Sequence, residues 1–153
     1  MGGSWLKHEF CDRLEDTALT YSLDEIAESF GKLAMAWLKA LVVYEKALDS
    51  DSSNTRMRQE FGVAKFIGGV FQSTHNIYKW YLIRKGKRTN KISPAERDII
   101  ANELENINTV LPFVEADSRA GFHQEPQWWM FDPDSIRQKI MSLSQYIRDS
   151  CEN

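Results

Sequence analysis

Two capping boxes mark helix starts in this sequence, and each stands directly before a run with helical apolar spacing. Ser22 is followed three residues later by Glu25, and Ser93 by Glu96 with Pro94 between them. A serine hydroxyl and a glutamate carboxylate placed this way satisfy free N–H groups of a first helical turn, and proline suits the first helical position. The sequence therefore predicts a helix start directly after each serine.

Apolar residues that recur every three or four positions predict four main helices. The expected helices run from Leu23 to about Leu48, from about Thr55 to Arg84, from about Pro94 to Val110, and onward from Pro133. No stretch alternates with period two over the length of a strand, so no sheet is expected. The fold class is therefore all-α, an antiparallel helical bundle of about four main helices with a long ordered loop before the last helix. The inward positions predicted for the first, third and fourth helices are Leu23, Ile26, Phe30, Leu33, Trp37, Leu41, Tyr44 and Leu48; Ile99, Ile100, Leu104, Ile107, Val110 and Leu111; and Ile136, Ile140, Leu143 and Ile147.

The second helix carries two apolar stripes, which predicts burial on more than one side and a central position. Gly68 and Gly69 each cost this helix about 1 kcal/mol relative to alanine. Either close packing against a neighbouring helix or a kink is expected there. His75 lies on one stripe, where a core histidine with satisfied hydrogen bonds is favoured over a ligand-binding one.

Length and composition limit the class of protein. The chain of 153 residues has the size of one domain, and 42% hydrophobic with 27% charged residues fits a globular protein. We expect an N-terminal segment over 1–21, with room for a short helix, and a bundle domain over 22–150. The net charge of -3 gives no electrostatic reason for nucleic acid, and no apolar run suits a membrane span. Neither partner is expected.

The N-terminal sequence lacks the apolar core of a signal peptide. A cytoplasmic location is expected if the chain stands alone, and export remains open if it belongs to a larger protein. Cys11 and Cys151 lie near opposite ends, so a disulfide between the termini and two free thiols both remain open. No cysteine–histidine spacing of a zinc site and no Glu-x-x-His pair occurs, and we expect no metal and no cofactor.

Reactive and stacking side chains concentrate in the segment EADSRAGFHQEPQWWMF, residues 115–131. Asp117, Arg119, His123 and Glu125 are its candidates for ligand contact. Acids paired across a cleft could serve glycoside hydrolysis, but a lone bundle offers no obvious cleft. A buried hydrogen-bond network that fixes the loop is the first expectation, ligand contact the second, and catalysis by this chain alone is not expected.

Trp128 and Trp129 lie side by side near the end of this segment. Packing in the core or an interface, contact with a protein partner, and stacking on a sugar ring all remain open. A separate basic stretch lies between the second and third helices. We interpret it as a solvated loop whose cations complement a helix C-terminus. Its members are Arg84, Lys85, Lys87, Arg88 and Lys91.

Three pieces of the chain together resemble one family. They are Trp37–Leu41 on the first helix, the set Asn76, Trp80, Tyr81 and Arg84 on the second, and the stretch from Glu115 to His123 that holds Asp117, Ser118, Arg119, Gly121 and Phe122. This pattern resembles the C-terminal all-helical domain of large bacterial proteins related to glycoside hydrolases, with alpha-glucuronidase-like or hexosaminidase-like barrels. The resemblance covers roughly residues 22–149. Ala120 stands where the family pattern has leucine, and we expect a loss of apolar contact there.

The resemblance implies a non-catalytic accessory domain that supports or docks on a catalytic barrel, because this chain is too short to hold one. The implied partner is that barrel domain, or a second copy of the chain in a homodimer. A stand-alone helical interaction or self-association module is the alternative. A sugar-binding module that uses Trp128, Trp129 and the acids of the 115–131 segment is the third reading, with carbohydrate as its partner.

Overall fold

The computed structural model describes residues 14–18, 20–51, 53–87, 91–120 and 132–151, and all regular structure within these ranges is helical. Four helices pack against one another, which confirms the predicted all-α bundle. The elements are the 3-10 helix η2 (Leu14–Thr17) and the α-helices α1 (Leu23–Ser50), α2 (Thr55–Arg84), α3 (Pro94–Ala116) and α4 (Pro133–Cys151).

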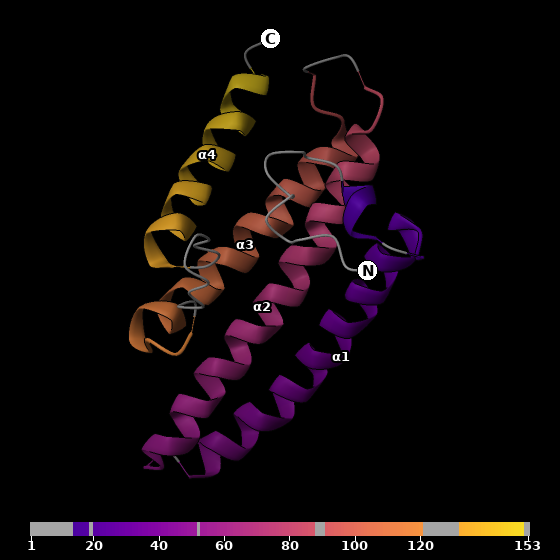
Figure 1. Ribbon diagram of the computed structural model, residues 1–153. Helices are drawn as coiled ribbons and strands as arrows, with labels where there is room; N and C mark the ends of the chain where they lie inside the picture. Colours follow the sequence, from indigo (N-terminus) through magenta and orange to yellow (C-terminus); the bar gives the residue numbers. More distant parts are fainter. Residues whose placement is uncertain (1–13, 19, 52, 88–90, 121–131, 152–153) are drawn as a thin grey trace.

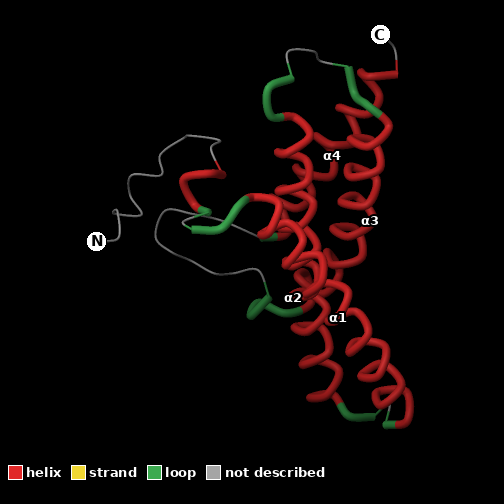
Figure 2. The backbone as a smooth tube through the Cα atoms, turned by 90° about the vertical axis from the view of Figure 1, so that its right-hand side faces the viewer, coloured by secondary structure: helices red, strands yellow, loops and turns green. Residues whose placement is uncertain are grey.

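The helices follow one another in space in the order of the chain, each running opposite to the one before (Figure 1). The extensive contacts join α1 to α2, α2 to α3, and α3 to α4. The C-terminal end of α1 and the N-terminal end of α2, which a short turn connects, project beyond the end of α3 in both views (Figures 1 and 2). α1 therefore lies at one edge of the array and α4 at the other.

Side chains cap the helix starts as the sequence predicts. The Glu25 amide donates to Oγ of Ser22 across 3.2 Å, and the Ser22 amide donates to the Glu25 carboxylate across 2.8 Å. Ser93 and its glutamate make the same reciprocal pair at the start of α3. At the start of α4, Oδ1 of Asp132 accepts from the Ser135 amide across 2.9 Å. At the start of α2, Oδ1 of Asn54 accepts from the Met57 amide across 3.0 Å, so a local side chain caps the start of each of the four helices.

Aromatic side chains hold α2 between its two neighbours, which confirms the predicted central position. Trp37 of α1 meets the Phe71 ring edge-on at 5.5 Å and donates from Nε1 to the Ala64 carbonyl across 2.7 Å. On the other side, Phe61 of α2 meets the Phe113 ring of α3 at 6.2 Å. α2 is thus buried by a different helix on each of two sides.

Close packing explains the paired glycines of α2, and the helix continues through them. A Cβ on Gly68 would lie 2.8 Å from Cδ1 of Trp37 on α1. A Cβ on Gly69, which faces the other neighbouring helix, would overlap Cγ2 of Val110 on α3. Both neighbouring helices therefore approach the α2 backbone closely at this level.

α3 is longer than predicted, because it passes through Pro112 to Ala116. Proline removes one backbone donor, and the carbonyl that loses it belongs to Asn108. Both residues are exposed, so water can serve that carbonyl. Beyond the proline, Val114 is buried in the core cluster formed by Ile107, Val110, Val114, Ala120 and Ile136. This packing favours helical continuation past the proline.

Most predicted inward positions are buried or half-buried, with exceptions on α1 and α2. Leu33 was expected to face inward but is 40% exposed, because it lies at the margin of the face that α1 turns to α2. Ile77, which belongs to one of the two apolar stripes predicted for α2, is 45% exposed at the edge of a cavity. The predicted short N-terminal helix corresponds to η2 alone within the described residues. Cys11 and the side chain of Cys151 lie outside them, so their pairing stays open.

Candidate functional site

Polar side chains from three helices meet around a buried carboxylate on α3. Asn76 of α2 donates from Nδ2 to Oε2 of Glu103 across 2.7 Å, and Nζ of Lys139 on α4 lies 2.5 Å from Oε1. Ser73 of α2 donates its hydroxyl to the same Oε1 and accepts from Nζ of Lys139 across 3.1 Å. These four residues form the Glu103 cluster. Each of its helices supplies at least one member.

Burial makes the pairing within the Glu103 cluster necessary. Ser73 is 1% exposed, and Asn76 and Glu103 are 4% exposed each, while the Lys139 side chain keeps 33% of its surface in water. A buried carboxylate is costly unless a cation and hydrogen-bond donors compensate it. Among the described residues, no buried side-chain nitrogen or oxygen lacks a hydrogen-bond partner. The cluster therefore acts as an internal polar contact that joins α4 to α2 and α3.

Two amides continue this network toward the surface. Gln72 donates from Nε2 to Oδ1 of Asn76 across 3.0 Å and to Oδ1 of Asn102 across 2.8 Å. Asn76 also donates to Oδ1 of Asn102 across 2.9 Å. The orientation of Asn76 is thus fixed from both ends of its side chain.

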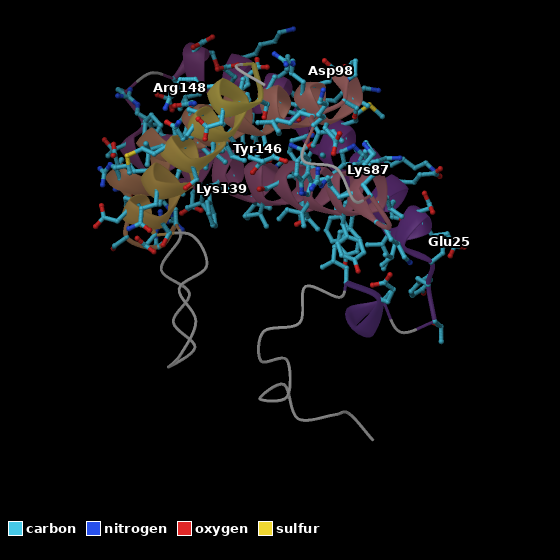
Figure 3. The ribbon with its side chains drawn as sticks, turned by 90° about the horizontal axis from the view of Figure 1, so that it is seen from above. Glu25, Lys87, Asp98, Lys139, Tyr146 and Arg148 are labelled. Carbon is cyan, nitrogen blue, oxygen red and sulfur yellow. The ribbon has the colours of Figure 1, made fainter. Side chains whose placement is uncertain are left out.

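A small cavity of about 110 Å³ adjoins the Glu103 cluster. Ligand pockets of enzymes and receptors usually enclose about 300–1,000 Å³, so this cavity suits a single small apolar group. Beside it, the Trp80 ring meets Tyr146 of α4 edge-on at 5.7 Å. Figure 3 shows Lys139 and Tyr146 on the side of α4 that faces the other helices. The cavity is lined by Asn76, Ile77, Trp80, Ile99, Ile100, Glu103, Lys139 and Leu143.

A second buried carboxylate, Glu96, closes the start of α3. Its side chain is fully buried, and Nζ of Lys87 lies 2.9 Å from Oε2. Burial by itself would raise the pKa of Glu96, but hydrogen bonds from Ser93 and Lys87 outweigh it and hold the pKa at about 2. Arg84 lies 3.5 Å from the other oxygen. Arg84 and Lys87, two cations of the predicted basic stretch, thus pair with the capping carboxylate at the start of α3. A third, Lys85, pairs with Glu15 of η2 at 2.5 Å.

Asp117 and Arg119, predicted to fix the loop, pair with each other directly after α3. Nη2 of Arg119 donates to Oδ2 of Asp117 across 2.7 Å, and the Arg119 amide donates to Oδ1 across 2.9 Å. These bonds lower the pKa of Asp117. Arg119 also reaches Glu60 of α2 across 3.1 Å. Ala120, which follows, is fully buried in the core cluster, and the expected loss of apolar contact relative to leucine stays a prediction.

The other predicted residues that the structure describes contact residues of the same fold. Tyr81 donates its hydroxyl to Glu15 across 2.5 Å, and the Arg84 guanidinium lies over the Trp80 ring at 5.7 Å. Ser118 is exposed. Six predicted residues lie outside the described ranges, so neither their expected ligand contacts nor the sugar platform is tested. These are Gly121, Phe122, His123, Glu125, Trp128 and Trp129.

His75 contacts the α1 backbone, as predicted for a core histidine. Its Nδ1 lies 2.7 Å from the carbonyl oxygen of Ala27, and the ring covers Gly31 closely. The ring is half-buried. It therefore joins α1 to α2.

Sequence reasoning missed the members of the Glu103 cluster other than Asn76. A signal for the carboxylate exists: Glu96 and Glu103 continue the three-and-four spacing of Ile100, Ile107 and Val110 along α3. An acid at an inward position predicts a buried partner. The sequence alone does not say that the partner is Lys139, because that residue lies on a different helix.

The outward side of α1 carries apolar side chains that the bundle leaves in water. Met35 is 60% exposed, Leu38 51% and Val42 51%. The apolar spacing along this helix predicts a single inward face, although Met35, Leu38 and Val42 also have helical spacing. This second apolar face is a candidate surface for contact with another protein.

The described part of the chain shows neither a metal-binding cluster nor a membrane span. No three histidine, cysteine, aspartate or glutamate side chains within the described ranges are grouped to hold a metal ion. The helices that the structure describes contain no stretch with the length and hydropathy needed to cross a bilayer.

Comparison with known proteins adds no assignment to this geometry. No family model, no curated protein and no solved structure matches the chain.

Proposed function

We propose that this chain is a non-catalytic helical module that docks on the catalytic barrel of a carbohydrate-active, glycoside-hydrolase-like protein. The observation that carries the proposal is the exposed apolar face of α1, formed by Met35, Leu38 and Val42, each at least half exposed. An apolar face of this kind on a helix at the edge of an array is typical of a protein contact.

The use of the buried polar groups supports a structural role. The Glu103 carboxylate is occupied by Ser73, Asn76 and Lys139. The Glu96 carboxylate at the start of α3 is likewise paired with Arg84 and Lys87. A general base or nucleophile needs access to a substrate, and these two carboxylates face cations and donors of their own fold. The adjoining cavity of about 110 Å³ is too small for a sugar residue in the usual range of ligand pockets.

The barrel as partner rests on the resemblance of three sequence pieces to the C-terminal domain of glycoside-hydrolase-like proteins. In this structure Asn76 and Arg84 of that pattern hold α3 in place through Glu103 and Glu96. Trp37 of the first piece holds α1 on α2. Residues that build a scaffold fit an accessory domain, whose task is to keep its shape against a neighbour.

Co-purification tests the proposal. The reading frame that lies directly upstream of the Met1 codon is expected to encode a barrel domain that co-purifies with this chain at equal stoichiometry. Val42→Glu in α1 is expected to abolish the association, while Met141→Glu, at an exposed apolar position on α4, leaves it intact. Circular dichroism checks that both variants keep their helices. An upstream frame with no barrel, or a barrel that does not associate, overturns the proposal.

Self-association is the second candidate, because a second copy could cover the same face of α1. Light scattering of the isolated chain separates the two. A monomer at micromolar concentration is expected if the face serves a different protein. A dimer that Val42→Glu dissociates would support a stand-alone self-association module instead.

A further inference from the structure

The outward face of α1 has the spacing of a coiled-coil seam. Met35, Leu38 and Val42 are separated by three and then four residues. This alternation is the heptad pattern that aligns one side chain in each turn along a straight helix–helix contact. We call Met35, Leu38 and Val42 the α1 seam. It spans about one heptad.

The α1 seam lies beside the face that α1 already uses. Ala34 and Leu41, each next to a seam residue in sequence, are 1% and 4% exposed against the bundle. Met35, Leu38 and Val42 are at least half exposed. α1 is an edge helix, and its other side has no helix beside it among the described elements (Figure 1). The seam is therefore positioned to accept one more helix on the edge of the array.

A row of lysines borders the seam on the side away from α2. Lys32, Lys39 and Lys46 are spaced by seven residues and are all exposed. Lys32 approaches Glu28 at 3.8 Å, one turn earlier on the same helix, and its side chain remains 77% exposed. Residues that border a helical seam determine which partner helix is accepted, because their charges face the flanks of that helix.

The lysine row disfavours a second copy of α1 as the occupant. In an antiparallel pair of α1 helices the two lysine rows would face each other, since equivalent flanks meet in that arrangement. In a parallel pair each row would face the flank that holds Ala34 and Leu41, which is buried in the bundle of the other copy. Neither arrangement gives the lysines an opposite charge.

We propose that the α1 seam binds an amphipathic helix of a different protein, one that carries apolar residues at heptad spacing and acidic residues along its flank. The acids would pair with Lys39 and Lys46 while apolar side chains cover Leu38 and Val42. This inference rests on the proposed docking function. It adds that the docking surface of the partner is a helix with an apolar row and an acidic flank. The outer layer of a barrel enzyme is itself a ring of helices, so the two proposals are compatible.

Two synthetic helical peptides test the charge and the seam together. Both are about 21 residues long with leucine at the seam positions; one has glutamate and the other lysine at the flanking positions. Calorimetric titration into the full chain is expected to show at least tenfold tighter binding of the glutamate peptide. Raising the salt from about 50 to 200 mM is expected to weaken that binding several-fold, because exposed charge pairs are screened.

Variants of the chain assign the effect to α1. Leu38→Ser is expected to weaken binding of the glutamate peptide at least tenfold, and Lys39→Glu with Lys46→Glu is expected to reverse the preference between the peptides. Met141→Ser and Arg148→Glu, both at exposed positions on α4, are the matched controls and are expected to change nothing. Thermal unfolding confirms that each variant is folded.

Equal binding of both peptides, no binding of either, or an unchanged preference after the charge reversal would overturn the inference. A dimer of the chain that Leu38→Ser dissociates would also overturn it, since the occupant would then be a second copy. If the glutamate peptide binds but no barrel co-purifies, the α1 seam is a binding surface for an acidic helix, and the barrel is overturned as its partner. If the barrel binds while the peptides fail, the docking function stands and the acidic helix does not.

Discussion

Buried carboxylates in this bundle are compensated by cations from other parts of the chain, and this has a measurable consequence at Glu96. The pKa of Glu96 is about 2, below its ordinary value of 4.5. A carboxyl with a lowered folded-state pKa stabilises the protein above its unfolded-state pKa, and this stabilisation is lost as the pH falls through the folded-state value. The contribution of Glu96 therefore disappears between about pH 4.5 and pH 2.

Glu96→Gln keeps the shape of the capping side chain and removes the charge. We expect a lower free energy of unfolding at pH 7 and a weaker dependence of stability on pH between 4.5 and 2. Urea denaturation at a series of pH values measures both effects. Glu105→Gln, at an exposed position on the same helix, is the control and should retain the wild-type profile. An identical acid profile for the Glu96 variant would contradict this account.

The Glu103 cluster predicts that one substitution is worse than two. Lys139→Met leaves the Glu103 carboxylate, 4% exposed, without its cation, and removing one partner of a buried pair costs about 3 kcal/mol. Adding Glu103→Leu removes the uncompensated charge, so the double variant is expected to regain most of the lost stability. Denaturant unfolding of the four proteins in this double-mutant cycle gives the coupling. Additive losses would show that the pair is not energetically linked.

At the scale of elements, the close approach of α2 and α3 depends on the absence of a side chain at Gly69. A Cβ there would overlap Val110, which is 7% exposed and packed in the core. By helix propensity alone, alanine would stabilise the helix by about 1 kcal/mol relative to glycine. A net loss of stability in the variant therefore reports the cost of the steric overlap. Gly69→Ala is expected to lower the melting temperature, and Val110→Ala in the same chain should relieve the overlap. Gly62→Ala, where the nearest atom is Cδ1 of Phe113 at 3.3 Å, is the milder control.

Replacing Pro112 of α3 is expected to raise the stability of the protein, whereas replacing Gly69 is expected to lower it. Helix α3 already passes through this position, and both Pro112 and Asn108 are exposed. Pro112→Ala supplies the missing backbone donor without disturbing the core, so the free energy of unfolding is expected to rise by about 1 kcal/mol. Chemical denaturation measures it. A loss of stability would mean that the proline is required by the turn that follows α3.

Helix starts could be read from the sequence, while one helix end and the buried partners could not. Ser22 and Ser93 act through residues three positions away, so their capping bonds are local and predictable. The extension of α3 to Ala116 depends on Val114, whose burial comes from packing against a separate helix. The pairing of Glu103 with Lys139 joins positions 36 residues apart. Such contacts are set by the arrangement of helices, which spacing along one helix does not encode.

The candidate docking surface shows the same limit. The heptad spacing of Met35, Leu38 and Val42 was present in the sequence, but any helix of a globular protein needs apolar residues for its core. Only the packing of Ala34 and Leu41 against the bundle shows which apolar residues are already used. Exposure is thus a property of the whole molecule, and it turns an unremarkable helix pattern into a candidate interface.

At the scale of the whole molecule, a sequential array of helices should not open uniformly. α4 lies at one edge, and its main contact is with α3. Among the residues that the structure describes, Ile136 is the one hydrophobic side chain of α4 that is buried. α1, at the other edge, buries Leu23, Ala27, Ala34 and Leu41. Opening of a segment costs less free energy where fewer apolar contacts are lost. α4 is therefore expected to open before the rest of the bundle.

Native-state hydrogen exchange measures this order directly. Amides in the middle of α4 are expected to exchange at least tenfold faster than those in the middle of α2, which has helices on both sides. Lys139→Met should accelerate exchange in α4 further, because Lys139 joins that helix to Glu103, and it should leave the α1–α2 contact nearly unchanged. Exchange of all four helices at one common rate would show a single cooperative unit. In that case the Glu103 cluster would couple α4 to global unfolding rather than restrain a local opening.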